Sequence, residues 1–265
     1  MTNSKSSDKP ELLRLISGMG SYGVAESEPK DQFLKRFLPL KEHARALESN
    51  VILVVGDRGA GKTELFRAIQ FPAGLRAISE LSGNRLIPPQ DRTDWMIGYA
   101  SSESSFPPEL VFRGFAKSKS PTDLQFIWLG LLLRSLQNQL PLLSPELKTA
   151  TLSNDLVRMY ATVEAHLVDV FSMLDSLDRE LVNSDRWIII PYDELDRVSA
   201  GDWGALAVIL RGLVQFWSSY ARRWERIRPK IFIRRDLFER VAIVGPDVSK
   251  IAAQRVELVW TPRLL

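Results

Sequence analysis

One stretch of eight residues constrains this chain more than any other. Residues 56–63 read Gly-Asp-Arg-Gly-Ala-Gly-Lys-Thr and match the pattern G-x-x-x-x-G-K-[ST] without a gap. An apolar, β-branched run, residues 51–55, precedes them, and a stretch typical of a helix, residues 64–70, follows them. The order strand, glycine-rich turn, helix is the context in which this pattern wraps around an anion. A tight turn with a surface lysine is the alternative, and it does not require that context.

The chemistry of this loop follows from its residue types. Glycines let the backbone curl so that successive N–H groups point into one concavity, and the following helix adds its positive N-terminal end. We expect Lys62 to reach the β- and γ-phosphates of a nucleotide and the Thr63 hydroxyl to bind Mg²⁺. The residues expected at the nucleotide are Gly56, Asp57, Arg58, Gly59, Ala60, Gly61, Lys62, Thr63 and Glu64.

An acidic pair lies far downstream of the loop. Residues 187–192, Trp-Ile-Ile-Ile-Pro-Tyr, read as an apolar strand that ends in Asp193 and Glu194. In P-loop NTPases an acidic residue in this position holds Mg²⁺. We assign that role to Asp193 and expect Glu194 to be the base that polarises the attacking water. The alternative is a strand that runs out into a polar loop. Pro191 is unusual inside a central strand and indicates a bulge there.

Composition sets the broad class of protein. With 265 residues the chain is long enough for one α/β domain with a sizeable core. Cysteine is absent, which excludes disulfides and thiolate metal sites, and the two histidines, His43 and His166, are expected on helix surfaces. No apolar run approaches the ~20 residues that span a bilayer, and residues 1–10 lack the apolar core of a signal peptide. We therefore expect a cytoplasmic protein without membrane contact.

The charge pattern gives little indication of a partner. The net charge is +3, which is too small to indicate nucleic acid by itself. The densest basic stretch is residues 222–230, with Trp224 among the cations. It is able to bind phosphates or an acidic partner. The preferred interpretation is a solvated cationic end of a helix, which the helix dipole favours. Nucleic-acid binding therefore stays open but unsupported.

The rest of the chain alternates between helix-like and strand-like segments. Residues 1–10 are expected to be disordered, and residues 11–265 to form one domain. Proline and glycine break the pattern around residues 71–120, where we expect an irregular insertion. The alternation predicts an α/β fold of the P-loop NTPase type, a mainly parallel sheet with helices on both faces. Expected helices cover residues 30–48 with a break at Pro39, 121–140, 153–183 and 203–223, and expected strands cover 95–100, 187–192, 230–234 and 255–260. The helix over 121–140 is apolar almost all round, so we expect it to be buried. Ser153 or Asn154 is the expected N-cap of the third helix, and Asp202 that of the fourth.

Four segments together resemble prokaryotic P-loop ATPases of the STAND and AAA-like type. They are residues 23–26, the loop at 56–63, residues 193–197 and residues 232–236. The resemblance implies that the first segment packs near the adenine. It also implies a helical lid after the last strand. This sequence ends at residue 265, so we expect that lid to be missing or truncated.

The same resemblance gives a role to an arginine. In the family a polar or arginine residue ends the strand beside the acidic one and senses the γ-phosphate. Arg234 matches that position, and Arg235 is the neighbour that would substitute for it. A guanidinium there is able to bind a phosphate in bidentate fashion. The alternative is an arginine that caps the strand end near Asp236 or Glu239.

The resemblance implies an ATPase in which hydrolysis of Mg·ATP switches conformation or assembly. Members of the group include regulators and antiviral-defence ATPases, so the implied partners are further copies of the chain or an effector protein. A nucleotide-dependent scaffold with little hydrolysis is the first alternative, and a kinase is the second; the paired Asp193 and Glu194 favour hydrolysis. No N-K-x-D motif is present, which favours adenine over guanine. Candidates for an arginine donated to a neighbouring subunit are Arg197, Arg211 and Arg222.

Overall fold

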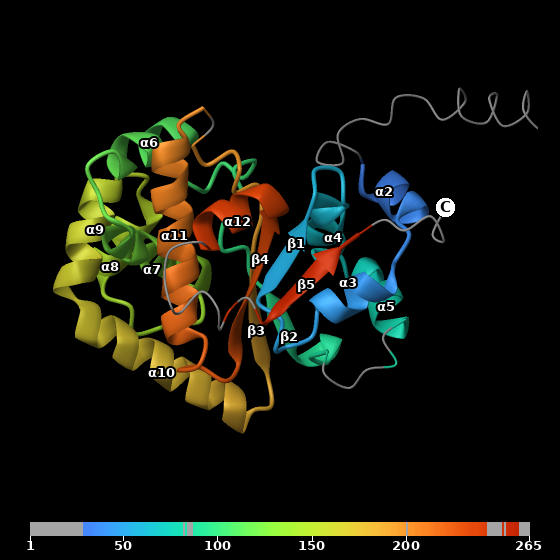
Figure 1. Cartoon of the computed structure of the whole chain (residues 1–265). Coiled ribbons are helices and arrows are strands. Elements are labelled where there is room, and N and C mark those ends of the chain that lie inside the picture. Colours follow the sequence, from blue (N-terminus) through green and yellow to red (C-terminus); the bar gives the residue numbers. More distant parts are fainter. Residues whose placement is uncertain are drawn as a thin grey trace, which may run out of the picture. The chain divides into compact units, whose positions relative to one another are not determined.

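The computed structural model in Figure 1 describes residues 29–81, 83, 87–199, 201–242, 251 and 253–259. The chain divides into two compact units, one up to residue 37 and one from residue 38 onward. The described part of the first unit contains α2 (Lys30–Arg36). The expected disorder of residues 1–10, the adenine segment at residues 23–26 and the expected lid after residue 260 lie outside the described residues.

One parallel sheet forms the centre of the second unit. Within the described residues it has five strands in the order β2–β3–β4–β1–β5, and every pair is parallel. This confirms the mainly parallel sheet. Three predicted strands need correction at their ends. The first, β4, begins before Lys230; the strand expected at residues 95–100 ends at Trp95; and β5 ends at Leu258, before residue 260. The strands are β1 (Leu53–Gly56), β2 (Thr93–Trp95), β3 (Trp187–Tyr192), β4 (Ile227–Arg234) and β5 (Arg255–Leu258).

Helices fill the connections between these strands. No helix of the described residues is long and apolar enough to cross a membrane. The helical elements are α3 (Lys41–Ala46), α4 (Lys62–Ala68), α5 (Pro72–Glu80), η1 (Gln90–Arg92), α6 (Glu109–Ala116), α7 (Pro121–Leu136), α8 (Pro145–Leu152), α9 (Leu156–Ala165), α10 (Leu167–Asn183), α11 (Trp203–Tyr220) and α12 (Arg235–Ala242).

Different helices cover the two faces of the sheet. Successive side chains of a strand point to opposite faces, and β4 shows both environments. Ile231 and Ile233 belong to the large buried cluster that includes α7 and α11. Phe232 lies between them and meets Phe66 of α4 edge-on, with ring centroids 5.9 Å apart. In Figure 1, α3, α4 and α5 accordingly lie on one side of the sheet, and α7 and α11 on the other.

Helix α7 is the centre of the larger helical layer. Nearly all of its apolar side chains are buried, as predicted for a helix that is apolar almost all round, and Phe126 is partly buried. The indole N–H of Trp128 donates to the carbonyl of Ile209 in α11 at 3.0 Å. Ser120 and Asp123 form a capping box at its start, with Pro121 at the first helical position. The helix ends at Leu136, before the predicted residue 140.

Residues 71–120 are more regular than predicted, because their prolines begin helices instead of breaking them. Pro72 occupies the first position of α5, and Pro108 immediately precedes α6. A proline at these positions loses no helical hydrogen bond, since the first N–H groups of a helix have no partner within it. The expected irregular insertion therefore contains two helices and the edge strand β2.

Two further helix predictions differ from the structure. The single helix expected over residues 153–183 is broken at His166 (φ −110°, ψ 22°) into α9 and α10. Asp155 is the N-cap of α9, accepting from the amide of Arg158 at 3.0 Å, whereas Ser153 or Asn154 was expected.

His43, which was expected on a helix surface, is only 3% exposed, so that prediction is wrong. Its burial lowers its pKa to about 4.

The bulge expected at Pro191 is absent from the pairing of β3 with β4, whose register is unbroken across this residue. The irregularity lies on the other neighbour of β3. Trp95 pairs with Ile189, but Tyr99 pairs with Tyr192. The segment after β2 therefore carries one residue more than β3 does over the same length, which is the arrangement of a β-bulge.

Candidate functional site

The loop between β1 and α4 depends on its glycines. Gly59 and Gly61 have φ values of 82° and 84°, in the left-handed region that residues with a side chain rarely adopt. Gly56 lies between β4 and β5, where an added Cβ would be 2.9 Å from the Cβ of Ala60 and 3.1 Å from the carbonyl oxygen of Leu258. Each glycine of the loop thus meets a requirement of the backbone, and together they let the loop curl at the N-terminus of α4.

Lys62 folds back across this loop. Its Nζ donates to the carbonyl oxygens of Gly56 at 3.0 Å and Asp57 at 2.9 Å. Burial lowers its pKa, while the nearby carboxylates of Asp193 and Asp196 act in the opposite direction. Both hydrogen-bond partners are neutral, so they do not cancel the charge of the ammonium group. A cation at a glycine-rich loop in front of a helix N-terminus is placed to attract an anion.

Asp193 lies directly after β3 and meets the loop through Thr63. Its side chain is 3% exposed and accepts a hydrogen bond from the Thr63 hydroxyl. Burial raises its pKa to about 7, and hydrogen bonds from Thr63 and the Glu194 amide act against that rise. Its Oδ2 atom is buried without a hydrogen-bond partner. Buried polar atoms are nearly always paired, so this oxygen next to a hydroxyl indicates a place for a cation.

The residues fit Mg²⁺ in a particular way. Mg²⁺ usually takes one or two protein oxygens and completes its shell with water and phosphate oxygens. Asp193 and Thr63 supply two such oxygens. No group of three or more His, Asp or Glu side chains that would hold a metal occurs in the part of the chain that the structure describes. A Mg²⁺ ion at this place would therefore depend on oxygens from a bound ligand.

Glu194 points to a different set of partners from those of Asp193. Its Oε2 accepts from the Ser101 hydroxyl at 2.8 Å and from the Ser102 amide at 2.6 Å. Arg197 lies 3.4 Å from Oε1. The backbone of Glu194 has φ 55°, an uncommon conformation for a residue with a side chain, and one that occurs often at functional sites.

Sequence reasoning missed Ser101 and Ser102. They follow residues 95–100, which were expected to form a strand. The carboxyl ends of parallel strands meet at one edge of a sheet, and that rule would have brought both serines to the acidic pair. Their contact with Glu194 spans more than ninety positions of the sequence, with |i−j| of 93 for Ser101.

Arg234 and Arg235 lie at the same edge of the sheet as the loop. Arg234 is in register with Gly56, and its guanidinium binds both carboxylate oxygens of Asp236 at 3.1 and 2.9 Å. This pairing raises its pKa. Arg235 links Asp57 of the loop, at 3.2 Å, to Glu257 of β5, at 3.0 Å. The contact of Arg234 with Asp236 is the one expected of an arginine at a strand end.

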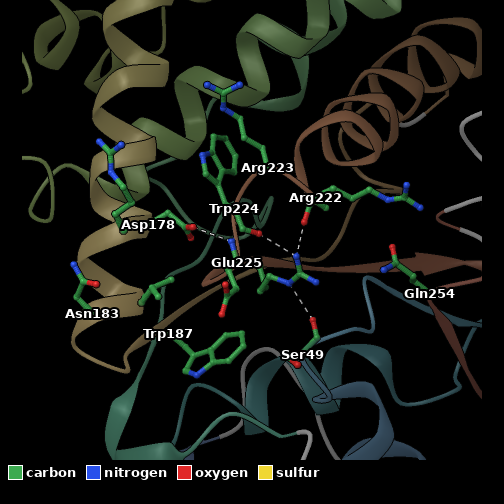
Figure 2. A pocket seen from close by; sticks show the side chains of 13 residues that line it. Ser49, Asp178, Asn183, Trp187, Arg222, Arg223, Trp224, Glu225 and Gln254 are labelled. Carbon is green, nitrogen blue, oxygen red and sulfur yellow. Dashed lines mark hydrogen bonds between the residues drawn. The ribbon is translucent and has the colours of Figure 1, made fainter.

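A cavity lies at the opposite, amino end of the sheet. It measures about 790 Å³ and is lined mainly by residues of α10 and of the segment between α11 and β4 (Figure 2). Asp178 is 7% exposed and accepts from the amides of Glu225, Arg226 and Ile227 at 2.8, 2.8 and 3.1 Å. Figure 2 shows the first of these bonds beside Trp224.

Internal contacts engage most cations of residues 222–230. Arg223 binds the carboxylate of Asp175 at 2.8 Å. Arg228 donates to the carbonyls of Ser49 and Trp224, each at 3.2 Å. Lys230 is fully buried, and burial lowers its pKa well below its usual value. Arg222 and Arg223, just after α11, are exposed as expected of a solvated helix end, whereas Arg228 and Lys230 are engaged inside the protein, so the interpretation holds for the first part of the stretch only.

The comparisons with known proteins add no assignment to this geometry. Neither the protein families, nor the curated proteins, nor the solved structures that were compared match the chain. The functional interpretation therefore depends on the residues themselves.

Proposed function

We propose that this chain is a P-loop ATPase of the STAND and AAA-like type, which binds Mg·ATP and hydrolyses it to switch conformation or assembly. The contact between Thr63 and Asp193 is the observation that carries the proposal. It joins the glycine-rich loop to the acidic strand end, and it leaves a buried carboxylate oxygen free beside a hydroxyl. A turn with a surface lysine gives no reason for that arrangement.

Each residue of the site has a role in this proposal. The amides of residues 57–62 and the Lys62 ammonium hold the phosphates, and Thr63 with Asp193 holds Mg²⁺. When bound, Mg²⁺ would neutralise charge on the β- and γ-phosphates. Glu194 accepts a proton from the attacking water. Arg234 would turn from Asp236 to the γ-phosphate to stabilise the charge that develops on it.

The contacts of Glu194 favour one alternative, a nucleotide-dependent scaffold with slow turnover. Two hydrogen bonds and a nearby arginine hold this carboxylate in place. Glu194 must leave Ser101 and Ser102, at least in part, to act on water. Adenine as the base, further copies of the chain or an effector as partners, and a part in antiviral defence rest on the resemblance alone.

The release of phosphate from Mg·ATP tests the proposal. We expect measurable turnover by the wild type and a loss of about 10³-fold in Glu194→Gln, within the range for removal of a general base. Glu225→Gln, which alters an exposed glutamate at the amino end of the sheet, is the matched control and should retain turnover. Equal rates for Glu194→Gln and wild type would show that Glu194 is not the base. Tight ATP binding without turnover in the wild type would support the scaffold.

A further inference from the structure

Arg134 of α7 is a buried cation whose partners come from two separate segments. Its side chain donates to the carbonyl of Ser105 on one side. On the other side it donates to the carbonyls of Thr151 and Ser153 and, at 3.1 Å, to Oδ1 of Asn154. The residue is 6% exposed, and burial lowers its pKa to about 10, so it stays charged at neutral pH. The planar fork of a guanidinium suits several acceptors at once, which an ammonium group cannot match.

The loop that Arg134 holds is also the loop that holds Glu194. Two successive turns shape it, one closed by the amide of Glu103 at 3.1 Å and the next by the amide of Phe106 at 3.0 Å. Phe106 is buried and anchors the end of the loop. Residues 101–102 at its start donate to Glu194. Because the turns are short and contiguous, a displacement of Ser105 is transmitted to residues 101–102.

The other partners of Arg134 belong to a corner that reaches the surface at Leu152 and Asn154, although Thr151 itself is buried. Residues 151–154 form the corner between α8 and α9, which we name the α8–α9 corner. Leu152 is 47% exposed, and Asn154 is exposed as well. Arg134 therefore connects a corner that solvent and other molecules reach to a loop that contacts the proposed base.

We propose that Arg134 is a positioning residue for Glu194, and that it couples the α8–α9 corner to nucleotide hydrolysis. This inference rests on the proposed function for its effect on turnover. Arg134 touches neither the loop at residues 56–63 nor the acidic pair through any described hydrogen bond, so it acts through Ser105. Loss of the Arg134 guanidinium changes the orientation of Glu194 and leaves phosphate binding by residues 56–63 unchanged.

Arg134→Lys is the principal test, because lysine keeps the positive charge and the aliphatic chain but lacks the planar guanidinium group. We expect kcat for ATP to fall roughly tenfold with KM within about twofold, since a misplaced catalytic group affects the chemical step more than binding. Arg158→Lys, an exposed arginine of α9, is the matched control and should leave both constants unchanged. Ser101→Ala should also lower kcat. The double variant should be no slower than the slower single variant, because both act through one loop.

Hydrogen exchange supplies a readout that does not depend on turnover. Arg134→Lys should speed exchange in the peptide containing residues 101–106, and Asn154→Ala should do so to a smaller degree. Asn154→Ala also serves if Arg134→Lys does not fold. If the wild type hydrolyses no ATP, the proposed function fails, and exchange alone decides on the coupling. Unchanged exchange in residues 101–106, or additive losses of kcat in the double variant, would overturn the inference.

Discussion

Asp178 and Asp193 are two buried aspartates at opposite ends of one sheet, and their surroundings differ. Asp178, at the amino end, accepts three backbone amides. Asp193, at the carboxyl end, accepts from Thr63 but keeps Oδ2 without a partner. Arg228 and Lys230, at the same end, also bind backbone carbonyls of neighbouring segments. The carboxyl end keeps an incompletely satisfied group in a costly environment, which is the pattern of a binding site rather than a structural one.

Asp193→Asn is the strongest test of this difference. It should lower Mg²⁺-dependent hydrolysis by at least 10²-fold, because a ligand of the ion is lost. It should also stabilise the free protein at pH 8. The folded pKa of about 7 exceeds the ordinary 3.8, so ionisation costs stability as pH rises through this window, with an upper bound of about 4 kcal/mol. Thermal melts without nucleotide at pH 5 and pH 8 check this, and a variant less stable than wild type at pH 8 would contradict it.

Asp178→Asn should have the opposite pattern. An amide in place of the carboxylate keeps fewer of the three contacts and turns a donor toward a backbone amide, so we expect a loss of about 3 kcal/mol in the free energy of unfolding. Hydrolysis per folded molecule should stay at the wild-type level. Urea unfolding measures the first quantity, with the exposed Glu180→Gln of the same helix as control. A loss of turnover without a loss of stability would place Asp178 at a functional site.

His43 should give the protein an acid-sensitive component of stability. Its folded pKa of about 4 lies below the ordinary 6.5, so the unfolded state takes up the proton first and stability falls as pH drops from 6.5 toward 4. Between pH 8 and pH 5 the loss amounts to about 2 kcal/mol. His43→Gln should reduce this acid dependence, and His166→Gln, which alters a partly exposed residue, should retain it. The sign is opposite to that of Asp193, so unfolding at several pH values separates the two groups.

Asp202→Ala should show that an acidic residue near the carboxyl end of the sheet can have a structural role and no part in nucleotide binding. Asp202 caps α11 by accepting from the amide of Ala205 at 3.0 Å. Its removal should lower stability by about 1 kcal/mol, which is typical of an N-cap. ATP affinity and kcat should remain as in the wild type. A large loss of either would mean that the start of α11 takes part in the site.

The sequence predicted the elements whose signal is local. The loop at residues 56–63, the strand that ends before Asp193 and the buried helix from Pro121 all have patterns that a short window contains. The cap at Asp202 was predicted correctly for the same reason. The parallel sheet followed from the alternation of these elements.

Features that depend on distant partners were not predictable in this way. Tertiary neighbours that no local pattern encodes account for three such features. They are the burial of His43, the contact of Ser101 and Ser102 with Glu194, and the ion pair of Arg223 with Asp175. The prolines at residues 72 and 108 were misread because a proline that starts a helix and one that breaks a pattern look alike without the fold.

Calorimetric titration with Mg·ATP tests the central claim most directly. Lys62→Ala removes the ammonium group that lies over the loop, and Lys148→Ala, an exposed lysine of α8, is its control. We predict that the wild type and Lys148→Ala bind alike, and that Lys62→Ala loses about 10²-fold in affinity, the equivalent of about 2.7 kcal/mol. Wild-type affinity for Mg·ATP in Lys62→Ala would contradict the assignment of residues 56–63 as a phosphate-binding loop.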